Sequence, residues 1–96
     1  MKKYHITGSF FIDEVFMETI PSHRQYVNKL ITSNIIEHYI VSMETQQIWI
    51  TLNAKNKAEA EKLLNKMPLK KYTEYEITEV YLYDGVTYRP VGFMLN

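Results

Sequence analysis

Residues 56–68, NKAEAEKLLNKMP, carry the clearest structural signal in this chain of 96 residues. Asn56 is a residue type that favours the cap position of a helix, and Glu59 completes a pattern similar to a capping box. The apolar positions recur at the helical spacing i, i+3, i+4 and i+7 and are Ala60, Leu63, Leu64 and Met67. Pro68 ends the pattern, because proline disfavours helical geometry in the residue before it.

Segments typical of strands flank this helix on both sides. Two strands are expected before it, over residues 35–43 and 48–53, and the polar connector 44–47 between them has the length of a hairpin loop. Another strand is expected after it, over residues 72–83. This part of the chain is therefore predicted to run strand, strand, helix, strand.

The first part of the chain supplies one more strand and one more helix. Residues 4–12 alternate as a strand does, and Gly8 in the middle indicates a bulge or a close approach by another group. Residues 13–20 are expected to be a connection. Pro21 is expected to open a helix that runs to about Thr32, because proline is well tolerated in a first helical turn.

This order of elements predicts an α+β domain of ferredoxin-like βαββαβ type. The simplest packing is a four-stranded antiparallel sheet with two helices on one face. We expect residues 1–96 to form a single domain, with a core over 1–85 that ends in a turn at Asp84-Gly85. The apolar tail 86–96 is expected to pack on a neighbouring subunit or back on its own subunit.

Composition excludes several classes of protein. Lysine plus arginine equals aspartate plus glutamate, 11 each, so the basic excess of a nucleic-acid-binding protein is missing. The chain has no cysteine, which rules out disulfides and cysteine-based zinc sites and agrees with a cytoplasmic location. No run approaches the roughly 20 apolar residues of a membrane span. Since no metal-ligand spacing and no phosphate-binding glycine loop occurs, we expect neither a metal nor a cofactor.

Apolar side chains are expected on both faces of the sheet. In the second strand, Ile36 and Ile40 are expected to point opposite to Tyr39. In the third strand, Trp49 is expected to point opposite to Ile50. The helices can cover only one face, so a second copy of the chain is expected to cover the other, in a homodimer or a higher homo-oligomer.

Residues 35–80 resemble the muconolactone isomerase family of the dimeric α+β barrel superfamily. The resemblance rests on the strand histidine His38, the strand with Trp49, the capped helix, Met67-Pro68-Leu69, Tyr72 and the acidic strand 74–77. It implies a dimeric α+β barrel with a pocket between sheet and helices near a subunit interface. It also implies an isomerase that moves a proton within an unsaturated lactone without a cofactor.

His38 and Glu79 are the expected catalytic residues. His38 corresponds to the strand histidine of the family, and an imidazole can transfer a proton near neutral pH. Glu79 shares a strand face with Ile77 and Tyr81, and an apolar setting raises the pKa of a carboxyl group. A structural histidine and a solvent-exposed carboxylate are the alternatives, and both stay open.

Further side chains are expected to line the substrate site: His5, Tyr39, Trp49 and Tyr72. Aromatic rings suit a flat or cyclic ligand, although packing in the core or at an interface is the alternative. His5 is either directed into the same cavity or exposed near the chain end. His23 is expected in the first turn of its helix, exposed to solvent.

Two functions remain open at this point. The first is a cofactor-independent isomerase that acts on a small unsaturated or lactone-like carbonyl compound. The second is a non-catalytic oligomeric protein of the same fold that binds a small hydrophobic or cyclic ligand, or that serves as an accessory protein. Two titratable groups within hydrogen-bond reach in a pocket favour the first, and a pocket of apolar rings alone favours the second.

Overall fold

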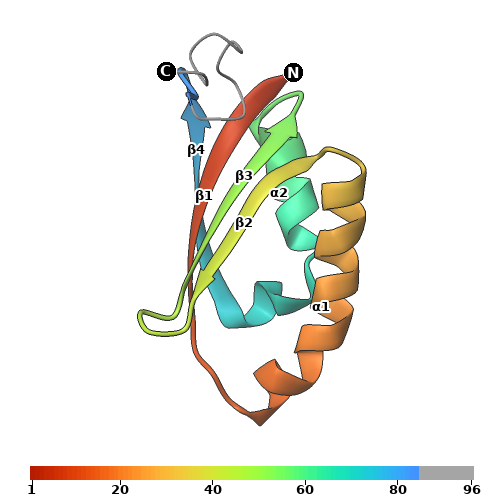
Figure 1. The fold of residues 1–96 in the computed structure, drawn as a ribbon, viewed down its shortest axis with the longest axis vertical. Coiled ribbons are helices and arrows are strands. Elements are labelled where there is room, and N and C mark those ends of the chain that lie inside the picture. The colour runs from red at the N-terminus through yellow and green to blue at the C-terminus, as the bar shows by residue number, and fades with distance from the viewer. Residues whose placement is uncertain (85–96) are drawn as a thin grey trace, which may run out of the picture.

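The computed structural model describes residues 1–84, in which a sheet carries two α-helices on one of its faces (Figure 1). The four strands are antiparallel in the order β2-β3-β1-β4, which confirms the predicted ferredoxin-like α+β fold. The tail 86–96 lies outside the described residues, and so does Gly85 of the predicted turn. The elements are β1 (Lys2–Phe10), α1 (Glu14–Thr32), β2 (Ile36–Ser42), β3 (Gln47–Ala54), α2 (Lys57–Asn65), the 3-10 helix η1 (Pro68–Tyr72) and β4 (Thr73–Val80).

The helix α1 begins at Glu14, and the prediction that it begins at Pro21 is wrong. Asp13 caps it, because its Oδ1 accepts a hydrogen bond from the backbone N–H of Phe16 at 2.8 Å. Residues 13–20, predicted as a connection, thus form the cap and the first turns of the helix. Pro21 lies inside the helix on its exposed side, where it removes one backbone hydrogen bond without entering the core.

The helix α2 begins as predicted. Asn56 Oδ1 accepts a hydrogen bond from the backbone N–H of Glu59 at 2.9 Å, and Glu59 Oε1 accepts one from the backbone N–H of Lys55 at 3.3 Å. These reciprocal bonds resemble a capping box. The difference is that the Glu59 side chain accepts from the backbone N–H of Lys55 and not from that of the cap residue Asn56. Pro68 does not belong to α2 but opens η1, where a missing N–H costs nothing.

The core lies between the helices and the inner face of the sheet, which is the face that α1 and α2 cover (Figure 1). Alternate residues of β1 and β3 point inward and are almost fully buried: Tyr4, Ile6, Phe10, Ile48, Ile50 and Leu52. Gly8 belongs to the same row, and a Cβ there would lie 2.7 Å from the ring of Tyr75. The glycine therefore marks a close approach, one of the two alternatives that the sequence suggests.

A β-bulge in β2 decides which side chains face the core. The register of β2 against β3 shifts between Ile36 and His38, so Glu37 and His38 both lie on the outer face, opposite to the helices. Ile36 is 1% exposed and Tyr39 packs against the core, so these two share the inner face. The prediction that Ile36 and Tyr39 point to opposite faces is therefore wrong. The inner face of β2 is apolar, and Ile40 is the one apolar side chain on its outer face.

The outer face of the sheet mixes apolar and polar side chains. Trp49 and Ile40 are cross-strand neighbours on it. At one end Lys3 donates hydrogen bonds to Glu37 and, at 3.1 Å, to Asn53 Oδ1, and the side chains of Lys3 and Glu37 are only 18% and 16% exposed. Burial alone would raise the pKa of Glu37, but the hydrogen bonds from Lys3 and Asn53 outweigh it and hold that pKa below its usual value.

Candidate functional site

A small apolar cavity lies between α1 and the β2 side of the sheet, and we call it the α1–β2 pocket. Its volume is about 180 Å³. Most of its wall is apolar and comes from Phe10, Phe16, Ile20, Val41, Met43, Ile48 and Leu69. Its polar groups belong to His23, Arg24 and Tyr39. A mostly apolar cavity with a few polar groups is the usual form of a small-molecule site.

His23 reaches this pocket because α1 begins at Glu14. From that start the inward-facing positions of the helix are Phe16, Ile20, His23, Val27 and Leu30, at the spacing of an amphipathic helix. His23 is 2% exposed, so the prediction that it lies in solvent is wrong. The same spacing is visible in the sequence, where Asp13 as a cap would have placed His23 on the buried face.

Across the interface of α1 and β2, the buried His23 forms a pair with the half-buried Tyr39. His23 Nε2 and the Tyr39 hydroxyl oxygen lie 2.5 Å apart. The other ring nitrogen, Nδ1, accepts a hydrogen bond from the backbone N–H of Leu69 at 3.4 Å. Tyr39 comes to this position through the bulge in β2, which turns its ring toward the helix.

Both members of this pair are neutral at neutral pH. Burial lowers the pKa of His23 to about 4, and the nearby Arg24 guanidinium adds to that effect. Burial also raises the pKa of Tyr39 well above its usual value. An acid or base works best with a pKa near the working pH, so these shifts suit hydrogen bonding to a ligand better than proton shuttling.

Arg24 lies at the rim of the pocket. Its guanidinium carbon is 5.5 Å from the centre of the Tyr39 ring, and its Nη2 donates a hydrogen bond to Asn28 Oδ1 at 3.0 Å. None of the residues that line the pocket is a carboxylate. The walls therefore offer hydrogen-bond donors and an apolar surface.

Of the residues that the sequence predicts for the site, only Tyr39 lines this pocket. His5, His38 and Trp49 lie on the outer face of the sheet, where His5 and His38 flank Thr51 on its two sides. His38 Nδ1 is also hydrogen-bonded to the hydroxyl of Tyr83. The outer-face residues thus form a group of their own, separated from the pocket by the sheet.

The remaining predicted residues, Tyr72 and Glu79, lie elsewhere. Tyr72 belongs to η1 and packs edge-on against Phe16, with ring centres 6.4 Å apart. Glu79 is exposed on β4 and forms an ion pair with Lys2 at 3.2 Å. His38 on β2 and Glu79 on β4 lie at opposite edges of the sheet, about 14 Å apart across three strand spacings. The structure therefore does not bring these two together.

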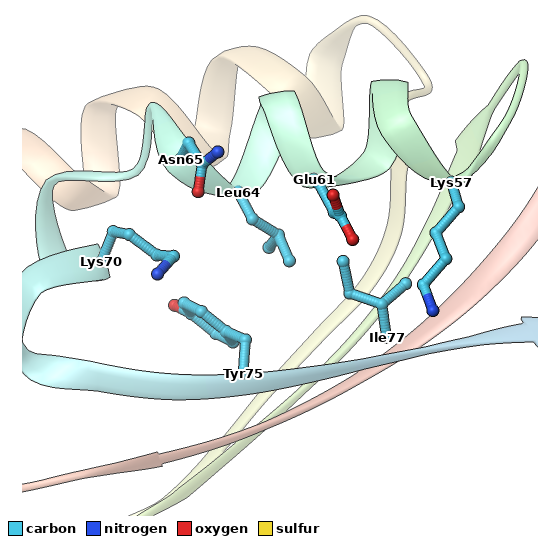
Figure 2. Close-up of a pocket in the computed structure, with 7 residues that line it drawn as sticks. All are labelled: Lys57, Glu61, Leu64, Asn65, Lys70, Tyr75 and Ile77. Carbon is cyan, nitrogen blue, oxygen red and sulfur yellow. The ribbon is translucent and has the colours of Figure 1, made fainter.

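A second hollow of about 350 Å³ lies at the other edge of the sheet, below α2 (Figure 2). The residues around it come from α2, η1 and β4 and are Lys57, Glu61, Leu64, Asn65, Lys70, Tyr75 and Ile77. Burial raises the pKa of Tyr75 to about 12, and its hydroxyl donates to the sulfur of Met67 at 3.8 Å. The charged side chains of Lys57 and Glu61 at this hollow are exposed, so it lacks the mostly apolar wall of the α1–β2 pocket.

Two further observations concern residues 1–84. No group of three or more histidine, aspartate or glutamate side chains within them is arranged to hold a metal ion. Neither helix in this range combines the length and apolar character that crossing a membrane requires.

Comparison with known proteins identifies the fold. No protein-family model and no curated protein matches the sequence. Among solved structures, a crystal structure of muconolactone isomerase superposes with a TM-score of 0.71, covering 92% of this chain and 97% of that chain. Sequence identity between the two is 10%, so the likeness shows a muconolactone isomerase-like α+β barrel fold and leaves function to the site itself.

Proposed function

We propose that this chain binds a small, largely apolar molecule in the α1–β2 pocket. The observation that carries this proposal is a cavity with a mostly apolar wall at which the buried imidazole of His23 is paired with the half-buried phenol of Tyr39. Burial of a polar pair is costly, and an apolar cavity beside it gives a ligand both a hydrophobic contact and one point of orientation. The fold does not dictate this site, because it depends on His23 and Tyr39.

A ligand screen by NMR tests the proposal. Small cyclic ketones, lactones and alkylbenzenes are titrated into labelled protein, and we expect shifts of the backbone signals around Ile20 and Leu69. Ile20→Trp should fill the cavity and abolish these shifts, whereas Ile31→Trp, on the exposed side of the same helix, should leave them unchanged. Equal binding to both variants, or no binding by any compound, would contradict the proposal.

A second candidate function is cofactor-independent proton transfer in a small unsaturated or lactone-like carbonyl compound. Two titratable groups lie within hydrogen-bond reach in the pocket, and the fold is that of muconolactone isomerase. His38 and Glu79, proposed from the sequence as acid and base, lie outside the pocket. Exchange of solvent deuterium into a bound lactone distinguishes the two locations. Loss of this exchange in Tyr39→Phe would support the pocket as the site of proton transfer, and its loss in His38→Gln or Glu79→Gln would support the residues outside the pocket.

We also propose that two copies associate through the outer faces of their sheets. Trp49 and Ile40 lie side by side on this face, and Ile40 is 54% exposed in the single chain. The helices of the same chain occupy the other face, so a second copy is the simplest cover for these side chains. Association of this kind would leave the α1–β2 pocket on the helix side of each subunit.

A further inference from the structure

The direction of the hydrogen bonds around His23 follows from one backbone group. Leu69 lies in η1 directly after Pro68, so its N–H is the first that this short helix presents. N–H groups in a first helical turn have no acceptor inside the helix, and this one points to His23 Nδ1 at 3.4 Å. A backbone N–H can only donate, and Nδ1 must therefore be the unprotonated nitrogen of the ring.

The proton of the neutral imidazole is then on Nε2. Since His23 is 2% exposed, the neutral ring with a single proton is the form to consider. Nε2 lies 2.5 Å from the hydroxyl oxygen of Tyr39 and donates to it. Tyr39 accepts in this bond, and its own O–H remains to be donated.

The hydroxyl proton of Tyr39 has no acceptor in the described part of the chain. Within residues 1–84 the Tyr39 hydroxyl makes no other hydrogen bond than the one to His23. Arg24 at the rim is a donor without acceptor capacity, and the sulfur of Met43 is only a weak acceptor. The pocket therefore presents one oriented O–H donor and no strong acceptor to whatever occupies it.

We infer that the α1–β2 pocket selects a ligand whose polar end is a hydrogen-free acceptor oxygen, such as a ketone, aldehyde or ester carbonyl, with Tyr39 as the specificity-determining donor and His23 as its positioning residue. The inference rests on the proposed binding function of this pocket. A ligand whose polar groups are only donors could not accept a hydrogen bond from Tyr39. A hydrocarbon would also leave the Tyr39 O–H unpaired, and an unpaired donor lowers the affinity for either ligand. Leu69 contributes to the choice of polar group through its backbone N–H, which fixes the tautomer of His23.

Matched ligands measure this selectivity. Acetophenone carries an acceptor oxygen, and ethylbenzene has nearly the same shape without one. We expect the ratio of acetophenone affinity to ethylbenzene affinity to be about tenfold or more higher in wild-type protein than in Tyr39→Phe, because the two proteins differ only in the O–H donor. Tyr39→Phe should lower this ratio while still binding ethylbenzene, and Tyr81→Phe, at a fully exposed tyrosine, should retain the wild-type ratio.

A spectroscopic readout separates positioning from packing. The carbonyl stretch of bound acetophenone should lie at lower frequency in wild type than in Tyr39→Phe, because a hydrogen bond weakens the C=O bond. His23→Leu should diminish this displacement. His23→Gln should restore it, since the amide can accept from Leu69 and donate to Tyr39. Nitrogen NMR should place the His23 proton on Nε2.

The outcomes are distinguishable. The same affinity ratio in wild type and in Tyr39→Phe, with the same carbonyl frequency in both, would overturn the inference while the pocket remains a binding site. A proton found on Nδ1 of His23 would overturn it as well. Failure of every ligand to bind would overturn both the inference and the proposed function.

Discussion

At the scale of single residues, His23 makes the fold sensitive to acid. Its imidazole is enclosed by α1, β2 and η1. The charged group that acts on it is Arg24, which is itself a cation and therefore cannot stabilise a protonated imidazole. In the unfolded chain the same ring regains an ordinary pKa near 6.5. The unfolded state therefore binds a proton more readily than the folded state does.

We predict that the free energy of unfolding falls as the pH is lowered from about 6.5 to about 4. The folded-state pKa of about 4 lies below the unfolded value, so stability is fully present above the unfolded pKa and is lost toward the folded one. The loss from His23 alone is on the order of 3 kcal/mol. Urea unfolding at a series of pH values measures it.

His23→Gln is the informative variant, because it cannot take up the proton. Its stability should change little between pH 6.5 and about 5, a range above the usual titration of most carboxylates. His5→Gln, at an exposed histidine of β1, should keep the wild-type slope. A wild-type slope that persists in His23→Gln would contradict this account.

At the scale of elements, α1 keeps a proline inside an otherwise regular helix. Pro21 is exposed and makes no contribution to the buried stripe of the helix. Its ring withholds the backbone hydrogen bond that would reach the carbonyl of Met17. The helix is nevertheless continuous, because Asp13 caps its start and Phe16 anchors its first turns in the core.

We predict that Pro21→Ala stabilises the protein by about 1 to 3 kcal/mol, since it restores the missing bond and adds a good helix former. Thermal and urea unfolding give the change directly. Gln25→Ala, at an exposed position of the same helix, serves as the matched control and should change stability by less than about 0.5 kcal/mol. A destabilised Pro21→Ala would show that the proline fixes a bend that the packing of α1 requires.

The elements also show what the sequence can and cannot predict. The cap and apolar spacing of α2 are local signals, and they place that helix correctly. The predicted start of α1 is wrong because proline is compatible with a first helical turn, and the prediction assigned Asp13 to a connection although it is the cap of this helix. The bulge in β2 has no local signature, and missing it assigned Ile36 and Tyr39 to opposite faces. Tyr39 was thus predicted for the site without its partner His23.

At the scale of the whole molecule, the two faces of the sheet have different roles. The inner face holds the core and the α1–β2 pocket. The outer face carries Trp49, the half-buried Lys3–Glu37 pair and both exposed histidines. Tyr83 packs on this face against Lys3 and His38, whereas both helices lie on the inner face. A second copy would place the Trp49 side chains of both subunits in one shared interior.

We predict that wild-type protein has the mass of a dimer or a multiple of it, and that Trp49→Glu lowers the mass to that of a monomer. Two carboxylates in an interface without water would be strongly unfavourable. Light scattering gives the mass, and circular dichroism confirms that the variant is folded. Gln25→Glu adds the same charge on the helix side and should remain associated. A wild-type monomer, or an unchanged mass in Trp49→Glu, would contradict the outer-face dimer.

The bulge in β2 also has a consequence for genetics. Glu37 and His38 together face Thr51 of β3, so removal of Glu37 alone would remove the bulge and restore regular alternation, with Tyr39 still inward and His38 still outward. A three-base deletion of that codon should therefore keep the phenol of Tyr39 in the pocket, whereas a six-base deletion that also removes His38 would turn Tyr39 outward. For the same reason, an alignment of this strand with a distant relative that omits a one-residue gap here compares inner residues with outer ones. Homologues of this chain should be compared with that gap permitted.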